Sequence, residues 1–312
     1  MLSLVVPVYS NEGSIPDLLL AVARLASDID APFETVFVVD GSPDRCYELL
    51  AQQLPSCSFS SQLVLLSRNF GSFAAIRAGL EAARGETFAV MAADLQEPPE
   101  LVQAMWQLLA CDAADVVVGV RNARNDPLMS RLFSGLFWRL YRRYVVPDVP
   151  HGGVDVFACN KAFRDELLKL EERHSSLIAQ VFWLGYRRKF VEYQRRVRQH
   201  GVSAWTFHKK LTYMMDSVFA FTDLPIRILI RGGGLVAALS GVFAIMVVIS
   251  RLAGLITVQG YAITILAIVF FGALNLFGLG LVGSYAWRAY ENTKARPLHV
   301  VLRRHLWTAE RT

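Results

Sequence analysis

Five short apolar runs, rich in β-branched residues, recur through the first 121 residues with stretches of helical length between them. The runs are LSLVVPVY, ETVFVVD, QLVLLSR, TFAVMAAD and DVVVGVR. This alternation is typical of βαβ units, in which helices cover both faces of a parallel sheet. Ligands of such sheets bind at the carboxyl ends of the strands, where Tyr9, Asp40, Asp94 and Arg121 fall. We therefore predict an α/β domain with a site along that edge.

A different pattern begins after residue 126. From 127 to 146, leucine and aromatic residues recur at helical spacing, and arginines stand between them. An apolar stripe flanked by arginines is typical of a helix that lies in the membrane interface. We predict such an interfacial helix over 127–146, within a domain that spans 1–205. The alternative is a helix that packs on the sheet.

Two long apolar segments, 229–250 and 262–285, contain no Asp, Glu, Lys or Arg except Arg231. Each is long enough to cross about 30 Å of hydrocarbon as a helix. We predict two transmembrane helices there, preceded by an amphipathic juxtamembrane helix over 206–228 and followed by a cytoplasmic tail over 286–312. The alternative is a buried hairpin of a soluble protein.

Composition and charge agree with a protein that is only partly in the membrane. Of the 312 residues, 54% are hydrophobic, and the net charge is +5. The start, MLSLVVPVYS, has neither a basic nor a long apolar region, so we predict no cleavable signal peptide. Lys and Arg flank the two apolar segments on their outer sides, whereas the connecting loop carries only Arg251. The positive-inside rule then places the domain and both termini in the cytoplasm.

The stretch VMAADLQEPPE ends an apolar run on polar groups. On an extended backbone, Asp94 and Gln96 would point to the same side. A carboxylate and an amide oxygen are hard ligands that suit Mg²⁺ or Mn²⁺, so we predict a divalent metal there. Pro98 and Pro99 would end the strand and open a helix. The alternative for Asp94 is a helix cap.

The order and spacing of several short motifs resemble one family. From about residue 3 to Pro297, the chain is similar to the family 2 glycosyltransferases of GT-A fold, and within them to the polyprenyl-phosphate, dolichyl-phosphate mannose synthase-like branch. The motifs are PVYSNEG, VVDGSPD, LSRNFGSFAAIRAG, AADLQEPPE, VVVGVR, VDVF, RQHGVSAW and KARP. No single motif is decisive, whereas their order is.

The resemblance implies a role for each matching residue. The donor nucleotide would be bound by Pro7, Tyr9, Asp40, Asn69, Gly71 and Arg121. Asp94 and Gln96 would hold the metal, and Asp94 and Asp155 would be catalytic, with Asp155 on the acceptor side. Arg198 and Ser203 match a stretch that meets phosphates. From their charge, Arg131, Arg139, Arg198, Lys209 and Lys210 are further candidates to hold the acceptor phosphate at the membrane surface.

Three departures from the family pattern remove acids near the nucleotide. Asn11 stands where the family has Glu, with Glu12 one place late, while Val39 and Ala92 each replace an Asp. A fourth departure changes Ser-Lys-Tyr to Ser203-Ala204-Trp205. Because Asp94 and Gln96 remain, we interpret these changes as a retuned donor site and not as a dead one.

The resemblance also implies the reaction and its setting. We expect transfer of one sugar from a nucleotide-sugar to polyprenyl (undecaprenyl) phosphate on the cytoplasmic face of a bacterial inner membrane, for cell-envelope or O-antigen glycan modification, by a homo-oligomer such as the tetramers of relatives. The alternative is a catalytically impaired membrane scaffold. A processive polysaccharide synthase is disfavoured because no Q-x-x-R-W motif occurs. Nucleic-acid binding is disfavoured because no recognition module occurs.

Overall fold

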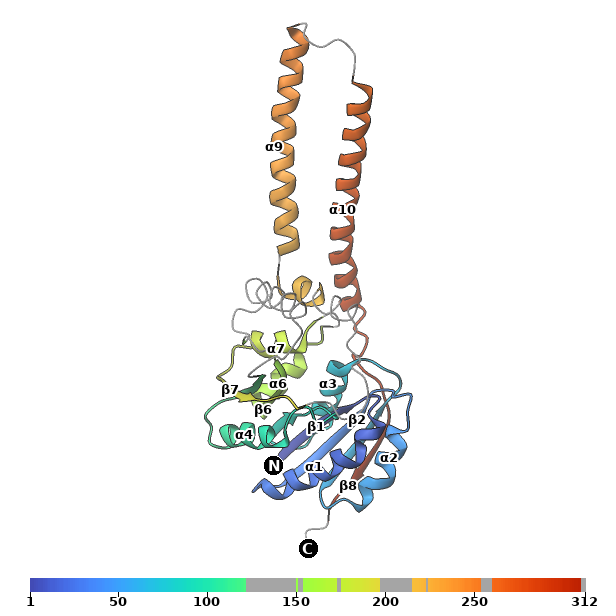
Figure 1. Ribbon diagram of the computed structural model, residues 1–312, viewed down its shortest axis with the longest axis vertical. Coiled ribbons are helices and arrows are strands. Elements are labelled where there is room, and N and C mark those ends of the chain that lie inside the picture. Colours follow the sequence, from blue (N-terminus) through green and yellow to red (C-terminus); the bar gives the residue numbers. More distant parts are fainter. Residues whose placement is uncertain are drawn as a thin grey trace. The chain divides into compact units, whose positions relative to one another are not determined.

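The chain leaves its first folded unit, forms a second one and returns to the first. The computed structural model describes residues 1–121, 150, 154–172, 175–196, 215–222, 224–253 and 260–309 (Figure 1). The first unit comprises the described residues of Met1–Thr212 together with those of Pro297–Thr312. The second unit is Tyr213–Arg296. Each unit is described by itself below.

The first unit is built on an eight-stranded mixed sheet in the order β7-β5-β6-β4-β1-β2-β3-β8. Neighbours within β3-β2-β1-β4 are parallel, as are β5 and β7, whereas β6 is antiparallel to β4 and β5, and β8 is antiparallel to β3. The five runs predicted as strands all form strands of this sheet. The bounds are β1 Leu2–Val8, β2 Phe33–Val39, β3 Ser60–Leu66, β4 Thr87–Val90, β5 Val116–Arg121, β6 Val154–Asn160, β7 Arg188–Tyr193 and β8 Val301–Trp307.

Helices cover both faces of this sheet, as predicted. On one face lie α1 (Ile15–Asp28), α2 (Cys46–Gln53) and α4 (Pro99–Ala110), with the 3₁₀ turns Glu12–Ser14 and Leu54–Ser56 at the ends of two connections. On the other face lie α3 (Ser72–Ala82), α6 (Lys161–Lys169) and α7 (Leu177–Trp183). The helix α3 lies so close to β1 that a Cβ on Gly79 would be 2.3 Å from Val5 Cγ1. This is the Rossmann-like arrangement of the GT-A fold.

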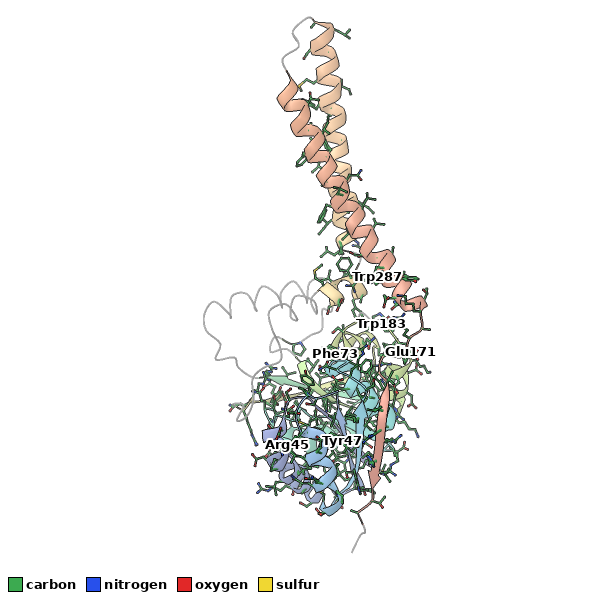
Figure 2. The ribbon with its side chains drawn as sticks, turned by 90° about the vertical axis from the view of Figure 1, so that its right-hand side faces the viewer. Arg45, Tyr47, Phe73, Glu171, Trp183 and Trp287 are labelled. Atoms are coloured by element: carbon green, nitrogen blue, oxygen red, sulfur yellow. The ribbon has the colours of Figure 1, made fainter. Side chains whose placement is uncertain are left out.

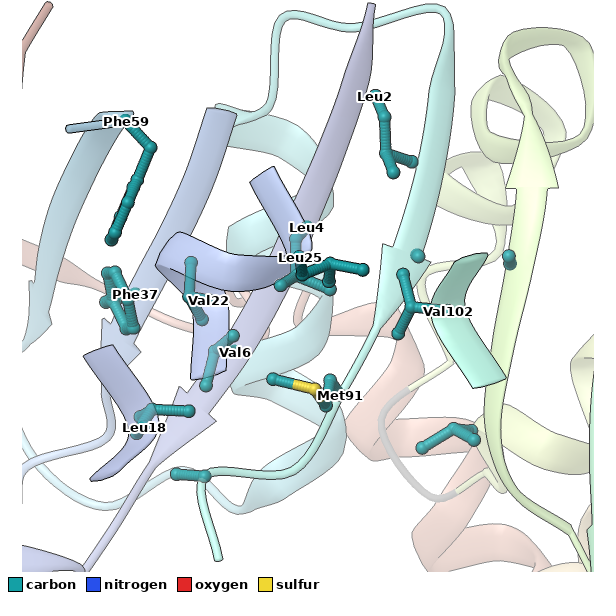
Figure 3. Close-up of a cluster of buried hydrophobic side chains, with 14 of the residues drawn as sticks. Leu2, Leu4, Val6, Leu18, Val22, Leu25, Phe37, Phe59, Met91 and Val102 are labelled. Atoms are coloured by element: carbon teal, nitrogen blue, oxygen red, sulfur yellow. The ribbon is translucent and has the colours of Figure 1, made fainter. Parts of the chain in front are cut away.

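The main core lies between β1 and α1. Alternate residues of β1, among them Leu4 and Val6, face Leu18 and Val22 of α1, and Phe37 of β2 extends the cluster (Figure 3). These five side chains have no solvent exposure. Burial of each is worth about 1.5–3 kcal/mol, so this core fixes the strands whose carboxyl ends carry the polar loops.

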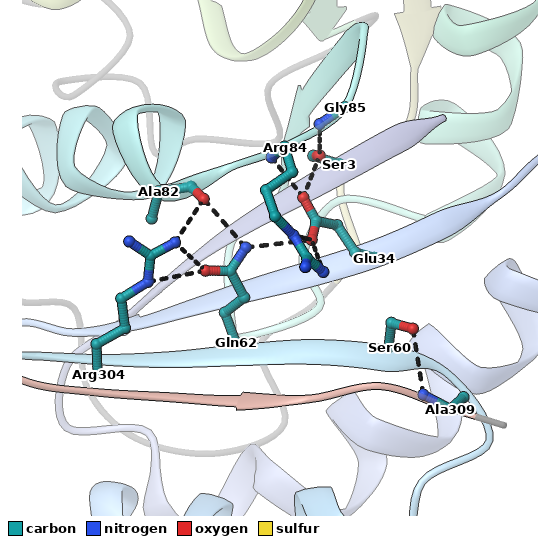
Figure 4. Close-up of polar contacts among 9 residues, drawn as sticks. All are labelled: Ser3, Glu34, Ser60, Gln62, Ala82, Arg84, Gly85, Arg304 and Ala309. Atoms are coloured by element: carbon teal, nitrogen blue, oxygen red, sulfur yellow. Dashed lines mark hydrogen bonds and ion pairs between the residues drawn. The ribbon is translucent and has the colours of Figure 1, made fainter.

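The predicted cytoplasmic tail is corrected by the structure. The helix α10 continues to Thr293, and β8 pairs with β3 in the register Val64↔Arg304. A buried polar network supports this pairing, because Arg304 of β8 donates to Gln62 Oε1 of β3 at 2.6 Å. The Gln62 amide nitrogen donates in turn to Glu34, which has no solvent exposure and also accepts hydrogen bonds from Ser3 and Arg84 (Figure 4). Residues 301–307 are therefore an edge strand of the sheet.

The second unit contains two long helices. They are α9 (Leu224–Leu252) and α10 (Tyr261–Thr293), and residues 215–221 form a short helix before them. The predicted juxtamembrane helix over 206–228 is therefore not continuous where it is described. The helical run ends before Thr222, whose hydroxyl accepts the Leu224 N–H at 3.2 Å, where α9 begins. Residues 206–214 lie outside the described residues.

The surfaces of α9 and α10 are apolar. Large side chains such as Leu239 and Phe243 of α9 and Phe277 of α10 are each more than half exposed, which water would disfavour. Among the described residues, one helical stretch, Phe270–Thr293, meets the length and composition needed to cross a membrane. Trp287, which is more than half exposed, lies toward the Thr293 end of this stretch (Figure 2).

Candidate active site

The loops that follow β1 and β2 are joined by one acid that sequence reasoning missed, Asp44. Its Oδ1 accepts the Ser42 hydroxyl at 2.6 Å and its Oδ2 accepts the Glu12 N–H at 3.1 Å. Ser42 Oγ in turn accepts the N–H of Ser10 at 2.8 Å. Burial raises the pKa of Asp44, but its hydrogen bonds with Cys46, Ser42 and Glu12 lower that pKa by more. The pKa of Asp44 is therefore below its ordinary value. The Ser-Pro-Asp turn was the available signal for this position.

Asn11 is used inside its own loop. Its side-chain oxygen accepts the Tyr9 N–H at 3.2 Å, and its own N–H donates to Cys46 Sγ at 3.4 Å. The acid one place later does not replace the missing one, because Glu12 pairs with Arg45 at 2.8 Å on the exposed side of the loop (Figure 2). The Arg45 guanidinium lowers the pKa of Glu12. Asn11 therefore shapes the backbone around Tyr9.

Asp40 binds the loop after β3 with both carboxylate oxygens. It is 2% exposed, and it accepts the Phe70 N–H at 2.7 Å and the Gly71 N–H at 2.8 Å. Burial raises the pKa of Asp40 although both donors oppose the rise. Gly71 takes φ +96° where α3 begins, a conformation that glycine adopts at little cost. Asp40, Asn69 and Gly71 are thus brought together, with Asp40 as the anchor of the loop.

Pro7 opens the sheet beside this loop. The last β1–β4 contact is the Met91 N–H, which donates to Val5 O at 3.0 Å. The next bond of a parallel ladder would need an N–H on residue 7, and proline has none. The strand β4 accordingly ends at Val90, and the chain turns toward Asp94. Pro7 thus has a defined structural role at the predicted donor site.

Asp94 and Gln96 lie on a turn and not on an extended strand, which corrects the predicted geometry. Leu95 between them has φ +53°, and Asp94 Oδ1 accepts the Gln96 N–H at 3.3 Å. The turn forms because the aspartate side chain bonds to the backbone two residues on. As predicted, α4 begins at Pro99.

Gln96 is hydrogen-bonded to the two arginines that follow β7, Arg195 and Arg196. The backbone oxygen of Gln96 accepts the Arg196 N–H at 2.8 Å, and its side-chain Nε2 donates to the backbone oxygen of Arg196 at 3.4 Å. Its side-chain Oε1 accepts a hydrogen bond from the Arg195 guanidinium. Arg196 also pairs with Glu100 of α4 at 3.1 Å. A groove of about 690 Å³ lies between α4 and β7 and is lined by the segment after β7. Sequence reasoning missed Arg195 and Arg196 because only the fold brings them to Gln96.

The oxygens of Asp94 and Gln96 are of the kind that a divalent cation such as Mg²⁺ takes as ligands. They stand on one turn, and no group of three or more His, Cys, Asp or Glu side chains that could hold a metal occurs in the described part of the chain. An ion at this turn would complete its coordination with water and phosphate oxygens, as Mg²⁺ commonly does.

Arg121 and Asp155 come from neighbouring strands of the sheet. Arg121 ends β5 and is paired in register with Tyr193, and Val154 of β6 is paired with Val120. Because β6 runs antiparallel to β4 and β5, the start of β6 lies at the edge where those strands end. The backbone of Asp155 is therefore at the predicted edge, and its side chain is not among those described.

The remaining site predictions meet the structure only in part. Val39 is buried in the core, whereas Ala92 is half-buried at the end of β4. The acceptor-phosphate candidates all lie outside the described residues, as does the predicted interfacial helix over 127–146. These candidates are Arg131, Arg139, Arg198, Ser203, Lys209 and Lys210.

The fold and this edge are those of a known family. The family model described as Glycosyl transferase family 2 matches residues 3–171, which is more than half of the chain. The chain therefore belongs to glycosyl transferase family 2.

Individual relatives match nearly the whole chain. It is 30% identical to the "Uncharacterized glycosyltransferase sll0501" of Synechocystis sp., over 99% of this chain and 96% of the relative. It is 33% identical to the "Undecaprenyl-phosphate 4-deoxy-4-formamido-L-arabinose transferase" of Pseudomonas aeruginosa, over 95% of this chain and 88% of the relative. These relatives place the chain in the polyprenyl-phosphate branch of the family.

A solved structure matches at a lower level. The glucosyl-3-phosphoglycerate synthase of Mycobacterium tuberculosis, in a complex with Mn²⁺, UDP and glucosyl-3-phosphoglycerate, matches with a TM-score of 0.47 at 16% identity, over 70% of this chain and 77% of the other. This similarity is too low to carry an inference about the site.

Proposed function

We propose that this protein transfers a single sugar from a nucleotide-sugar to polyprenyl (undecaprenyl) phosphate at the cytoplasmic face of a bacterial inner membrane. The product would serve modification of cell-envelope or O-antigen glycans. One observation carries the proposal: a family 2 sheet and two long apolar helices belong to one chain, and along the sequence the helices come between strands β7 and β8 of that sheet. Relatives named as undecaprenyl-phosphate transferases support the acceptor.

The donor side of the proposal uses the loops at the carboxyl edge. Tyr9, the loop anchored by Asp40, and the turn of Asp94 and Gln96 all follow parallel strands of one sheet. A diphosphate at this edge would face basic side chains, among them Arg121, which ends β5. Asp94 and Gln96 would hold Mg²⁺ or Mn²⁺, which neutralises charge on the leaving diphosphate when it is bound.

The acceptor side needs little help with proton removal. A phosphate monoester has its second pKa near about 6, so it is mostly dianionic at neutral pH. Its oxygen can attack the anomeric carbon in line with the leaving diphosphate, which inverts the configuration at that carbon. Asp155, at the start of β6, then orients the acceptor or accepts a residual proton. The basic residues predicted for the acceptor phosphate hold it near the membrane surface.

The return of the chain to its sheet supports a topology with two membrane crossings. Because β8 lies in the same sheet as β1, a crossing by α9 must be matched by a crossing by α10. An even number of crossings leaves both termini and the sheet on one side. The distribution of Lys and Arg assigns that side to the cytoplasm.

Thiol labelling tests this topology. Cys111 is exposed in the first unit, and Gly260 is the N-cap of α10, at the opposite end of that helix from Thr293. Two single-cysteine variants are compared, one with Cys111 alone and one with Gly260→Cys alone. A membrane-impermeant maleimide applied to spheroplasts should label only the second, and applied to inverted vesicles only the first. The reverse pattern would place the sheet outside the cell.

The activity is tested directly by radiolabelled transfer. Full-length protein in detergent is incubated with undecaprenyl phosphate, Mg²⁺ or Mn²⁺, and a panel of labelled nucleotide-sugars, and labelled lipid is extracted. Transfer from at least one donor, lost without metal and in Asp94→Ala, is the expected result. Full activity in Asp94→Ala would exclude the metal role.

A membrane scaffold without activity remains the second candidate. The observation that favours it is the loss of three family acids at Asn11, Val39 and Ala92, with Asn11 engaged inside its loop. Calorimetry with nucleoside diphosphates separates the two functions, because a scaffold that has lost its donor site gives no heat with any of them in the presence of Mn²⁺. Homo-oligomer formation, including a tetramer, stays a prediction for either function.

A further inference from the structure

Gln96 has a partner for each of its polar groups. Its N–H donates to Asp94 Oδ1 at 3.3 Å, its backbone oxygen accepts the Arg196 N–H at 2.8 Å, and its amide nitrogen donates to Arg196 O at 3.4 Å. The fourth group, Oε1, accepts from the guanidinium of Arg195. The amide cannot exchange its nitrogen and oxygen without losing both side-chain contacts, so Oε1 is held facing Arg195.

The guanidinium groups of Arg195 and Arg196 have different partners. The guanidinium of Arg196 pairs with Glu100 in the first turn of α4 at 3.1 Å, and its backbone pairs with Gln96, so Arg196 fixes the segment after β7. The guanidinium of Arg195 instead has Gln96 Oε1 as its contact among the described residues. A neutral amide is a weaker partner for a guanidinium than a carboxylate or a phosphate.

We propose that Arg195 and the divalent metal compete for Gln96 Oε1, and that metal binding transfers the Arg195 guanidinium to the diphosphate of the donor. This inference rests on the proposed function, because it takes the metal and the diphosphate from it. It assigns a role to Arg195 as a positioning residue that couples the two ligands.

The competition has a simple electrostatic cause. A divalent cation binds an amide oxygen at about 2.1 Å for Mg²⁺, and a guanidinium hydrogen-bonded to the same oxygen would then be only about 4 Å from it. Two cations at that distance repel each other even at this exposed contact, although solvent weakens the repulsion. Gln96 Oε1 therefore binds one of them at a time.

A diphosphate resolves this competition. Its oxygens accept hydrogen bonds from the displaced guanidinium, and this interaction is stronger than that with an amide oxygen. The diphosphate oxygens also neutralise the charge of the metal. Metal and diphosphate should therefore bind with positive cooperativity beyond their direct contact. Such coupling is reciprocal, so each ligand raises the affinity for the other by the same factor.

Free Mn²⁺ measured by electron paramagnetic resonance tests the proposal on the full-length protein in detergent. For Mn²⁺ alone, Arg195→Ala should bind more tightly than the wild type by roughly 5- to 50-fold, within the usual range of coupling between sites. Addition of inorganic pyrophosphate should raise Mn²⁺ affinity in the wild type and much less in Arg195→Ala. Arg195→Lys, which keeps the charge without the fork, should lie between the two.

A double-mutant cycle separates competition for one oxygen from a general effect of charge. If Arg195 acts through Gln96 Oε1, the gain from Arg195→Ala should disappear in the Gln96→Ala background. Lys161→Ala serves as a charge control, because Lys161 pairs with Glu86 at 3.2 Å beside the start of β4, at the other edge of the sheet. It should leave Mn²⁺ affinity unchanged.

Three outcomes would overturn the proposal. They are an unchanged or weaker Mn²⁺ affinity in both Arg195 variants, a gain that persists in the Gln96→Ala background, and a wild type that does not bind Mn²⁺. The last outcome would also remove the metal from the proposed function, whereas the first two leave sugar transfer intact. The expected shifts without any sugar transfer would instead uphold the coupling and refute the transferase.

Discussion

Arg304 of β8 donates two hydrogen bonds to Oε1 of Gln62 in β3, one from Nε at 3.0 Å and one from an Nη atom at 2.6 Å. The same Nη atom donates to Ala82 O at 3.0 Å, and the Gln62 amide nitrogen donates to Glu34 at 3.1 Å. Arg304, which follows both apolar helices in the sequence, is therefore hydrogen-bonded into the buried polar network of the sheet.

Removal of this arginine should destabilise the first unit. Arg304→Ala leaves the buried oxygen of Gln62 without its charged donor, so we expect a loss of about 1–3 kcal/mol in the free energy of unfolding. For a unit of this size, each kcal/mol lost lowers the midpoint temperature of thermal unfolding by about 2–4 °C. Thermal unfolding in detergent, followed by near-UV circular dichroism, measures it. Arg303→Ala on the same strand is the matched control, and an equal fall in both variants would contradict the role of the network.

Glu34 should make stability depend on pH. Burial alone would raise the pKa of Glu34, but the hydrogen bonds from Arg84, Ser3 and Gln62 lower it below its ordinary value. A lowered pKa in the folded state stabilises the fold above the ordinary pKa of a glutamate, and this contribution is lost as the pH falls through the lower, folded value. Glu34→Gln should cost about 1.5–3 kcal/mol at neutral pH. The gap between variant and wild type should narrow in acid, and a constant gap from neutral pH to pH 3 would count against this.

Asp40→Asn should weaken donor binding through the loop it anchors. The amide nitrogen of asparagine cannot accept the N–H of Phe70 or Gly71, so one backbone group loses its acceptor at a cost of about 1–3 kcal/mol. We expect a higher KM for the nucleotide-sugar and a smaller change in kcat. Asp44→Asn, which disturbs the neighbouring loops, is a useful comparison. A pure loss of kcat at unchanged KM would point to a direct catalytic role for Asp40.

Asp94→Asn and Asp155→Asn should differ in their dependence on metal. Loss of a charged ligand at Asp94 should lower transfer by roughly 10²- to 10³-fold, with partial recovery at high Mn²⁺. The effect of Asp155→Asn should not respond to metal concentration. Steady-state rates over a series of Mn²⁺ concentrations distinguish the two, and recovery of Asp155→Asn by metal would move that residue to the metal site.

Ala92→Asp tests whether the donor site is retuned. Ala92 is half-buried at the end of β4, so an acid there can reach the edge where the family has one. We expect a changed order of donor preference in a competition assay over a panel of nucleotide-sugars, by about tenfold or more for at least one donor. Ala92→Ser controls for size. An unchanged order of preference would make Ala92 a neutral replacement.

The sequence predicts the elements of the fold that depend on the residue pattern within one short segment. The five predicted strands are apolar runs in their own right, and the start of α4 follows from Pro98 and Pro99. The strand β8 is different, because it is an edge strand whose exposed side is not uniformly polar. Its partner β3 also lies far away in the chain, so the local pattern of residues 301–307 predicts only a tail.

The site was predictable as a set of positions and less so as a set of contacts. The family pattern placed Asp40, Asp94 and Gln96 at the correct edge. It did not indicate that Asp40 bonds to two backbone N–H groups, or that Gln96 faces Arg195. Such contacts join segments up to about a hundred residues apart, and they depend on strand order, which motif spacing does not contain.

The return of the chain to its sheet also sets an order of assembly during synthesis. Residues 301–307 are translated only after both apolar helices, so the edge of β3 stays unpaired while those helices are being translated. An open edge strand invites pairing with other chains, and domains begin to fold as they are synthesised. The nascent protein therefore completes its sheet only after its helices have been translated, and a chain that stops before Pro297 carries an aggregation-prone edge in place of a finished domain.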